Sequence, residues 1–329
     1  MNQIKPIDGN GFGHLTVLLH EAAASLNLVP GSIAIDCTLG GGGHTRLLLD
    51  AVGKNGKVFA FDRDFMAIDH TQKTFAAEVA SGQLLLVHKP FSEMADHVRK
   101  AGLAATISGV LADLGVSSPQ LDIGERGFSF LKDGPLDMRM DPSRPGTAAD
   151  LVNTAEEAEL ARIFRDFGEE PMARHFAKMI CRQRATEPFT KTLQLASYLE
   201  KHSPYGSKSR KHPATKIFQA IRIAVNEELD ELNRFLDEAV PLLAPKGRLS
   251  VITFHSLEDR AVKHFFAKAS GKTKRQELSR RVVLTESEMD KMVNAQGRVV
   301  ASSEAEPSAE EIEINPRARS ARLRVFERA

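Results

Sequence analysis

The sequence predicts an α/β protein, with a doubly wound parallel sheet and an all-helical inserted domain. Short continuous apolar runs alternate with helical segments over residues 32–113, which is typical of parallel strands buried on both faces. The α/β pattern is then interrupted by about 100 residues, mostly helical, and resumes with a strand signal at residues 248–254. We expect a core in two parts, residues 1–122 and 216–329, and a helical insertion, residues 123–215, that recognises the substrate.

The composition excludes several classes of protein. The 329 residues suffice for about two domains of ordinary size. Lysine and arginine total 44 and acidic residues 43, so any nucleic-acid surface must be local. Cys37 and Cys181 lie far apart and match no metal-ligand spacing, so we expect no disulfide framework, no metal and a reducing, cytoplasmic location. No apolar window is long enough to span a bilayer, so we expect no membrane association.

The elements of the first half follow from apolar runs and glycine turns. The apolar stretch at residues 15–28 predicts an amphipathic helix rather than a signal peptide. Strands are predicted at residues 33–37, 58–61, 84–87 and 107–111, and helices at 45–52, 66–79 and 91–101. Ligands of such sheets bind beyond the carboxyl ends of the strands, where Asp36, Asp62 and Asp113 lie.

The second half begins with residues 117–145, a long stretch without periodicity that is typical of a functional loop. Thr154 and Glu157 have the spacing of a capping box for the first helix of the insertion. Further helices are predicted near residues 172–180, 193–199 and 216–240, the last ending before Pro241. Two late apolar pieces, residues 282–284 and 323–326, predict an antiparallel edge pair.

Four consecutive glycines, residues 40–43, lie between the first strand and the next helix and let a ligand approach the backbone closely. The alternative is a tight turn, for which one glycine suffices. Thr45 takes the third glycine position of a dinucleotide fingerprint, and no Gly-Lys-Ser/Thr sequence follows. The loop has no lysine and Asp36 and Asp62 flank it, so a cationic nucleoside such as S-adenosylmethionine suits it. Asp62 would accept ribose hydroxyls, and Asp64 would cap a helix.

Eight sequence blocks occur in an order that identifies a family. They are DCTLGGGGH (36–44), DLGVSSPQLD (113–122), RGFSF (126–130), GPLDMRMD (134–141), HPAT (212–215), FQAIR (218–222), FHSLEDR (254–260) and NPRARS (315–320). Over about residues 12–328 the chain resembles the MraW/RsmH family of bacterial 16S rRNA (cytosine-N4)-methyltransferases.

The resemblance implies a class I, Rossmann-like methyltransferase core with S-adenosylmethionine as cofactor. It implies direct methyl transfer to the exocyclic amine of a cytidine in the decoding region of 16S rRNA, within the small ribosomal subunit. Matching the motifs residue by residue gives the cofactor-binding candidates Gly42, Gly43, His44, Asp62, Phe91, Asp113 and Gln120. The alternative for Phe91 is ordinary core packing. The oligomeric state stays open, and a homodimer is one of the states considered.

The cytosine amine is a poor nucleophile, so transfer needs in-line placement and groups that accept a proton. Candidate acceptors are Asp113, Asp137 and His255. Asp137 is equally able to pair with Arg139, and His255 to be a hydrogen-bonded structural histidine. The Pro-Pro-aromatic motif of related amino-methyltransferases is missing after Asp113, which leaves the amine-binding group unidentified.

Basic residues gather in three windows, 201–222, 271–281 and 315–328, and such windows favour RNA phosphate contact. The RNA-binding candidates are Lys208, Arg210, Lys211, Lys216, Arg222, Arg317 and Arg319. The alternative for each window is a solvated face. Phe128 and Phe130 are candidates to hold an extruded base, or else cover the core of the insertion.

Three other functions compete with this interpretation. One is a methyltransferase that acts on another RNA site or another atom. A second is a non-catalytic ribosome-assembly factor, which leaves the glycine loop and Asp62 without a role. The third is a nicotinamide-dependent oxidoreductase, against which the absent third glycine counts.

Overall fold

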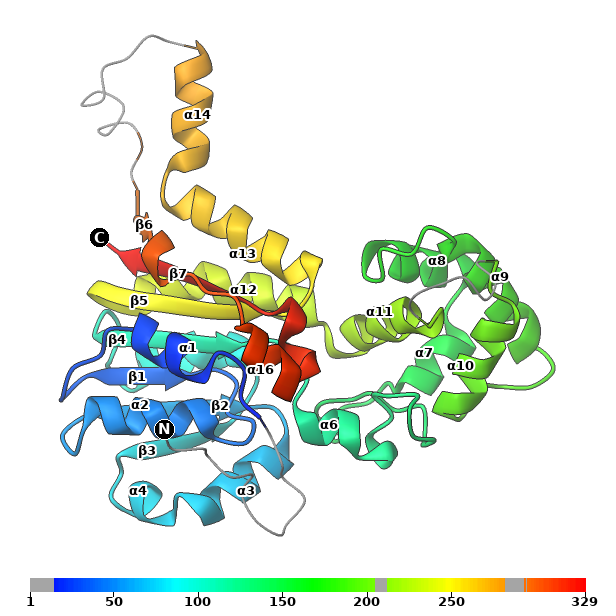
Figure 1. Cartoon of the computed structure of the whole chain (residues 1–329), viewed down its shortest axis with the longest axis horizontal. Coiled ribbons are helices and arrows are strands. Elements are labelled where there is room, and N and C mark those ends of the chain that lie inside the picture. The colour runs from blue at the N-terminus through cyan, green and yellow to red at the C-terminus, as the bar shows by residue number, and fades with distance from the viewer. Residues whose placement is uncertain (1–14, 205–211, 282–292, 294) are drawn as a thin grey trace. The chain divides into compact units, whose positions relative to one another are not determined.

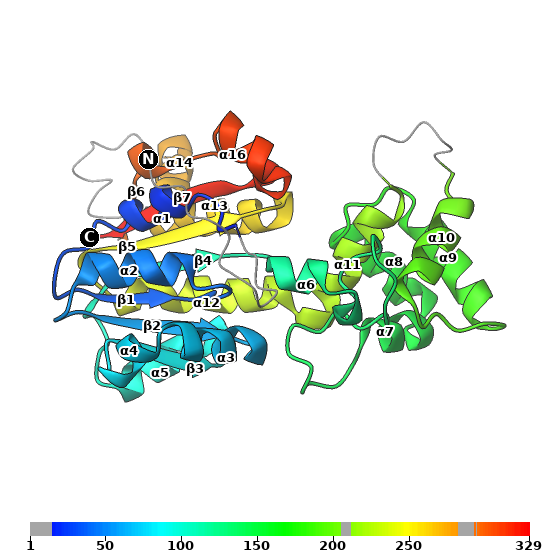
Figure 2. The same cartoon turned by 60° about the horizontal axis from the view of Figure 1, so that its bottom comes forward.

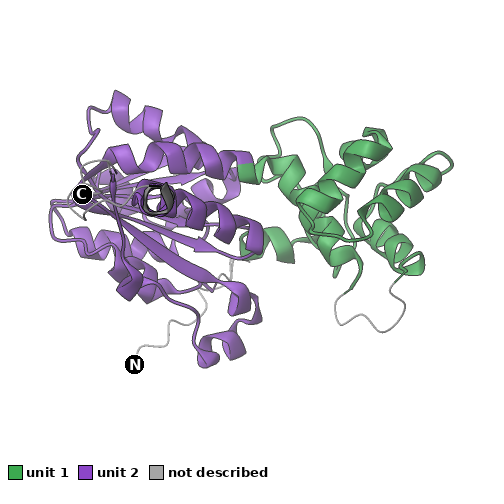
Figure 3. Ribbon diagram, turned by 90° about the horizontal axis from the view of Figure 1, so that it is seen from above, with its two compact units in different colours: residues 1–14, 116–229 green, residues 15–115, 230–329 purple. Residues whose placement is uncertain are grey.

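A computed structural model describes residues 15–204, 212–281, 293 and 295–329 (Figure 1). The chain divides into two compact units (Figure 3). The sheet unit comprises residues 15–115 and 230–329, and the helical unit comprises residues 116–229. The divisions therefore fall at residues 116 and 229, whereas the sequence placed them at 123 and 215. That the helical unit recognises the substrate stays a prediction.

The sheet unit contains a seven-stranded sheet of order β3-β2-β1-β4-β5-β7-β6. The strands are β1 (Ile33–Asp36), β2 (Lys57–Asp62), β3 (Leu84–His88), β4 (Ile107–Asp113), β5 (Leu243–Thr253), β6 (Gly297–Val299) and β7 (Arg322–Arg328). The first five strands are parallel, and β7 runs antiparallel to both β5 and β6. Chain order reverses between β1 and β4, which is where doubly wound sheets place their ligands.

Helices cover both faces of this sheet (Figures 1 and 2). Ile35 and Phe59 pack into the core formed with α5 (Met94–Lys100), α12 (Glu228–Leu242) and α13 (Ser256–Ala269). Ala34 and Val58, one residue earlier, pack into the core formed with α1 (Leu19–Ser25) and α2 (Gly43–Val52). Successive strand residues point to opposite faces, so each strand contributes to both cores. The predicted doubly wound α/β fold is confirmed.

The remaining elements of this unit are short or peripheral. They are α3 (Phe65–Thr74), α4 (Ala76–Ala80), η1 (Phe91–Glu93), α14 (Lys272–Arg281), η4 (Ala301–Ser303), α16 (Ala309–Ile314) and η5 (Pro316–Ser320). The single helix predicted at residues 66–79 is two helices, because Phe75 leaves helical geometry at φ −115°. The helix predicted at residues 91–101 begins as the 3-10 turn η1.

The helical unit is built from α6 (Ser118–Asp122), η2 (Gly124–Arg126), α7 (Ala148–Thr154), α8 (Glu157–Asp166), α9 (Ala173–Arg184), α10 (Thr192–Lys201) and α11 (Ala214–Asn226). Its core includes Phe164, Phe176 and Ile180, all fully buried. Because these side chains recur at helical spacing, the amphipathic pattern predicted the helices and the faces they bury. The all-helical character of this region is confirmed.

The predicted capping box at Thr154 and Glu157 is wrong. Thr154 is the last residue of α7, and its hydroxyl donates to the carbonyl of Asp150. The capping box lies seven residues earlier, where the Thr147 hydroxyl accepts from the Asp150 amide and the Asp150 carboxylate accepts from the Thr147 amide. Aspartate serves as well as glutamate at this position because its shorter side chain still reaches the cap amide.

The helix predicted over residues 216–240 is also two helices. Glu227 takes the left-handed conformation, φ 52°, and separates α11 from α12. Pro241 lies inside the last turn of α12 instead of following its end. A proline in the last turn removes one hydrogen bond but leaves the rest of the helix intact. The rule that a helix ends before a proline therefore placed the end of α12 too early.

The antiparallel edge pair predicted near the end of the chain is only partly described. Residues 282–284 lie outside the described residues, whereas residues 323–326 lie in β7, which pairs with β5 and β6.

Among the described residues, no helix combines the length and apolar character needed to cross a bilayer.

Asn226 fastens the irregular segment of the helical unit to the end of α11. Its side-chain oxygen accepts from the Met140 amide at 2.8 Å, and its amide nitrogen donates to the Met138 carbonyl at 2.7 Å. Asn226 is buried, so these backbone groups have little access to water as a substitute partner.

We expect Asn226→Ala to lower the free energy of unfolding by about 1–3 kcal/mol for each buried group left unpaired. Thermal and urea unfolding, followed by circular dichroism, would measure the loss. The matched control is Asn55→Ala, which truncates an exposed asparagine of the sheet unit. Equal stability of the two variants would refute the role of Asn226.

Candidate active site

The loop after β1 is tied to both neighbouring strands at the carboxyl edge of the sheet. The Asp113 amide, at the end of β4, donates to the Thr38 hydroxyl at 2.7 Å. On the other side, the Gly40 amide donates to the Asp62 carboxylate at 2.9 Å. The sequence analysis missed Thr38. Its signal is a hydroxyl two residues after a strand-terminal aspartate, since the Thr38 amide also donates to Asp36 in an Asx turn.

Two glycines of the loop are required by contacts inside the sheet unit. Gly42 has φ +78°, and a Cβ there would lie 2.8 Å from the Phe75 ring. A Cβ on Gly43 would lie 2.1 Å from the Thr16 hydroxyl. Close packing therefore explains these two glycines as well as the ligand approach that the sequence suggested. Contact of Gly42 and Gly43 with the methionine part of a cofactor stays a prediction.

Asp36 is fully buried beneath the loop, and its two carboxylate oxygens have separate donors. The Thr45 hydroxyl donates to one oxygen at 2.6 Å and the Thr38 amide to the other at 3.1 Å. Burial raises its pKa, an effect that these hydrogen bonds oppose. Asp36 therefore organises the loop and the first turn of α2.

Asp62 lies at the end of β2 with one carboxylate oxygen on the glycine loop and the other on the start of the next helix. One accepts from the Gly40 amide at 2.9 Å and the other from the Asp64 amide at 2.8 Å. Burial raises the pKa of Asp62 to about 6. A carboxylate oxygen has capacity for a second donor, so ribose hydroxyls fit here. The predicted cap is confirmed, because Asp64 accepts from the Met66 amide at 3.1 Å.

Asp113 is the third carboxylate of this edge. Burial is the main cause of a pKa well above its usual value, and the nearby carboxylates of Asp36, Glu258 and Glu311 raise it further. One oxygen lies 3.8 Å from Nδ1 of buried His44. The other oxygen is buried and has no hydrogen-bond partner within the described part of the chain. A ligand that brings positive charge or a hydrogen-bond donor to this oxygen would stabilise the ionised carboxylate and supply the missing hydrogen bond.

These features fit S-adenosylmethionine, which carries a sulfonium and an ammonium group. The edge offers acidic acceptors at Asp62 and Asp113, and the glycine loop between them has no lysine. The arrangement suits a cationic nucleoside better than a nucleotide, whose phosphates would lie among carboxylates.

Two further cofactor candidates have other contacts that the structure accounts for. Phe91 is buried, and its ring packs edge-on against Phe235 with centroids 5.2 Å apart, as core packing requires. Gln120 is buried in the helical unit, where its side chain accepts from the Ser117 amide and completes the capping box of α6. Cofactor contact by either residue stays a prediction.

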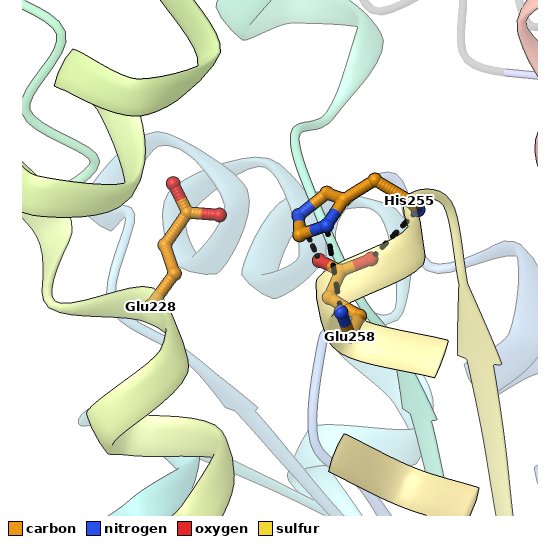
Figure 4. A group of neighbouring side chains, drawn as sticks. All are labelled: Glu228, His255 and Glu258. Carbon is orange, nitrogen blue, oxygen red and sulfur yellow. Dashed lines mark hydrogen bonds and ion pairs between the residues drawn. The ribbon is translucent and has the colours of Figure 1, made fainter. Parts of the chain in front are cut away.

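His255 follows β5 and caps α13, as Figure 4 shows together with Glu258. Its Nδ1 accepts from the Glu258 amide at 3.4 Å, and its Nε2 lies 3.2 Å from a Glu258 carboxylate oxygen. The other Glu258 oxygen accepts from the Phe254 amide at 2.8 Å. The imidazole is thus held in one orientation, as the hydrogen-bonded alternative foresaw, and a role in proton transfer stays a prediction.

Asp137 forms the pair with Arg139 that was its alternative role. Two hydrogen bonds join the carboxylate to the guanidinium at 2.8 and 2.7 Å. Hydrogen bonds from Arg139 hold the pKa of Asp137 below its usual value, although partial burial acts in the opposite direction. A carboxylate stabilised in its ionised form is a weak proton acceptor, which counts against Asp137, and proton acceptance by Asp113 or His255 stays a prediction.

The aromatic and basic candidates of the helical unit also have structural contacts. Phe128 is buried in the helical core, and Phe130 packs edge-on against Phe218. Lys216 donates to the Glu169 carbonyl, and Arg222 forms two hydrogen bonds of 2.8 Å with Glu228. The other RNA-binding candidates of this unit, Lys208, Arg210 and Lys211, lie outside the described residues.

Two of the five arginines in the window at residues 315–328 pair with acidic neighbours. Arg322 pairs with Glu306, and Arg324 pairs with Asp259 and Glu304. Arg317 and Arg319 are exposed on η5. RNA contact by these two residues stays a prediction.

A doubly wound α/β core with an acidic edge suited to a cationic nucleoside defines a Rossmann-like methyltransferase. Residues 11–329 match the model of the MraW methylase family. The chain belongs to this family. It is similar to a Shewanella loihica protein named ribosomal RNA small subunit methyltransferase H, at 48% identity over 320 residues that cover 96% of this chain and 98% of that protein.

Two solved structures are also similar to this chain. One, titled a putative rRNA-methylase from Clostridium thermocellum, is 13% identical, with 95% of this chain and 97% of that chain covered and a TM-score of 0.42. The other, titled an rRNA methylase from Streptococcus thermophilus, is 12% identical, with 95% and 98% covered and a TM-score of 0.39. Family membership confirms the expected methyltransferase activity and the expected cofactor, S-adenosylmethionine.

We expect Asp62→Ala to weaken S-adenosylmethionine binding by about tenfold or more, because it removes a ribose acceptor and frees the Gly40 amide of the loop. Isothermal titration calorimetry would measure the dissociation constant. Asp69→Ala, on the exposed side of α3, is the matched control. An unchanged constant for Asp62→Ala would remove the residue from the cofactor site.

Cofactor affinity should rise with pH, because a cationic ligand favours ionised carboxylates. Asp62, with a pKa of about 6, should contribute near that pH, and Asp113, whose pKa burial also raises, should add a contribution of its own. Asp113→Asn should reduce the total rise of affinity with pH and leave the contribution of Asp62 near pH 6 in place. Comparing the two proteins cancels the titration of the ligand's own ammonium group. Identical profiles would show that Asp113 does not meet the ligand's charge.

Proposed function

We propose that this protein methylates the exocyclic amine of a specific cytidine in the decoding region of 16S rRNA. The observation that carries the proposal is the full-length match to the MraW methylase family in a chain whose sheet edge presents Asp62 and Asp113. The 48% identical relative is named for the RNA of the small ribosomal subunit, which supports the choice of substrate.

When bound, S-adenosylmethionine supplies an electrophilic methyl group. The chain's own residues would do the rest. The hydrogen bonds of Thr38 to Asp113 and of Gly40 to Asp62 fix the loop before substrate arrives, so less conformational entropy is lost on binding. Asp62 would hold the ribose, and Asp113 would meet the positive charge with its unpartnered buried oxygen.

The cytosine amine must lose a proton as its nitrogen gains a methyl group. We infer that Asp113 or His255 accepts that proton. Their elements are neighbours, because Asp113 pairs in register with Ile252 of β5, three residues before His255. Burial favours a protonated Asp113, so an ionised Asp113 would be a stronger base than an exposed aspartate. The Glu258 amide donates to Nδ1 of His255, so His255 would have to release that hydrogen bond to take the proton, whereas one oxygen of Asp113 has no hydrogen-bond partner within the described residues.

The proposal includes the setting of the reaction. The substrate would be the RNA within the small ribosomal subunit, in the cytoplasm, with the helical unit contributing to its recognition. Phe128 and Phe130 are committed to the core of that unit, which disfavours them as side chains that hold an extruded base.

The decisive experiment supplies radiolabelled S-adenosylmethionine to small ribosomal subunits that lack the modification, followed by digestion to nucleosides. We expect label in N4-methylcytidine, and a large loss of turnover in Asp113→Ala with the RNA still bound. Subunits that already carry the modification are the control, since their target amine is already methylated.

Other outcomes would separate the competing functions. Label in another nucleoside would keep the methyltransferase but overturn the target. Cofactor binding without label in either subunits or free 16S rRNA would overturn the substrate. Absence of both cofactor binding and label would favour a non-catalytic assembly factor.

A further inference from the structure

Helix α9 of the helical unit presents a row of three bases that the sequence windows did not include. Arg174, Lys178 and Arg182 occur at i, i+4 and i+8, and all three are exposed. Residues of this spacing lie on one side of a helix. No acidic residue occurs from 171 to 186, so no side chain of α9 itself neutralises them. We call these three residues the α9 row.

Six other bases of the unit have an acidic partner, whereas the members of the α9 row have none among the described residues. Arg139, Arg144 and Arg162 pair with Asp137, Glu227 and Glu159. Arg165 pairs with Asp166, Lys191 with Asp133, and Arg222 with Glu228. Within residues 116–204 and 212–229, no ion pair involves a member of the α9 row. Its charge is therefore available to an external anion.

The row also carries a cost that an anion would remove. Like charges at i and i+4 destabilise a helix by about 0.2–0.5 kcal/mol a pair, and the row contains two such pairs. Burial raises the pKa of Tyr198 on α10, and the charge of Arg182 acts in the opposite direction, so that charge is felt at α10. Buried residues on the opposite side of α9, such as Phe176 and Ile180, fix the helix on the core. The row is thus rigidly presented.

The geometry suits a regular polyanion. Four residues of helix rise about 6 Å, so the three bases span about 12 Å in equal steps. That step resembles the separation of successive phosphates along one RNA strand. At the start of α9, a depression of about 390 Å³ is lined by Arg174, His175, Arg165 and Glu170, among others. The Glu170 carboxylate accepts from the Met172 amide, so this depression is not itself assigned as an anion site.

We propose that the α9 row binds consecutive phosphates of the substrate RNA strand. The inference rests on the proposed function, since it takes RNA as the substrate, and adds a contact surface distinct from the basic windows. Such contacts position the RNA without reading its bases, so they would raise affinity for any sequence.

The test measures binding of a fluorescein-labelled, single-stranded fragment of 16S rRNA from the decoding region over a range of salt concentrations. We expect the triple variant Arg174→Gln/Lys178→Gln/Arg182→Gln to bind more weakly. The magnitude of the slope of log affinity against log salt should decrease by about 2, because each lost phosphate contact on a single strand removes roughly 0.7 and the variant loses three. Cofactor affinity, measured separately, should not change.

Two controls keep the result specific. Lys54→Gln/Lys57→Gln/Lys100→Gln removes the same charge from exposed positions of the sheet unit and should keep the salt slope. Arg174→Lys/Arg182→Lys keeps the row's charge and should also keep it. Circular dichroism would verify that each variant is folded. Because the triple variant removes repulsion on an exposed surface, we expect its melting temperature to hold or rise.

Each remaining outcome decides against the inference. If wild type and triple variant share the same affinity and slope, the α9 row is a solvated face, while the proposed function stands. If the α9 variant and the sheet-unit control lower the salt slope by the same amount, RNA affinity depends on net charge alone and the α9 row is not a specific contact surface. If wild-type protein shows no salt-dependent RNA binding, the proposed RNA substrate fails together with the row.

Discussion

Asp36, Asp62 and Asp113 end neighbouring strands at one edge of the sheet, and the burial of their carboxylates is the constraint on which the site depends. Both oxygens of Asp36 and of Asp62 accept hydrogen bonds from the chain, whereas one buried oxygen of Asp113 has no hydrogen-bond partner within the described residues. Burial and neighbouring carboxylates favour the protonated form of Asp113, so the ionised form needs a compensating positive charge. We therefore expect the site to favour a cationic ligand on electrostatic grounds alone.

Residues at this edge also hold the glycine loop in place between the strands. Thr38 accepts from the Asp113 amide and donates its own amide to Asp36, so one threonine connects the ends of β1 and β4. Asp62 holds the Gly40 amide from the other side. The glycines between these ties are packed against Phe75 and Thr16, so the loop has little freedom to adjust. Such a loop loses little entropy on binding, at the cost of burying the carboxylates that fix it, which raises their pKa values.

The sequence predicted the sheet and its acidic edge because both depend on local signals. Apolar runs ending in aspartate specify a buried strand and its carboxyl end, and glycines after such a strand specify a close turn. Breaks inside helices were not predicted, since Phe75 and Glu227 carry no local signal for leaving helical geometry. Ion pairs between residues distant in sequence were not predicted either. Arg222 pairs with Glu228 and Arg324 with Asp259, so these arginines are less available to bind RNA phosphates. A count of basic residues along the sequence does not take such acidic partners into account.

That distinction changes how an RNA surface should be sought in this protein. Charge density along the chain favoured residues 201–222 and 315–328, yet several described bases there are held by acids or carbonyls of the same unit. A phosphate must displace such a partner before it gains anything, and the exchange of one anion for another is worth little. Arg174, Lys178 and Arg182 meet no such competition within the described residues. Uncompensated charge on a rigid helix, rather than the local density of basic residues, is therefore the better physical criterion for the surface that first meets RNA.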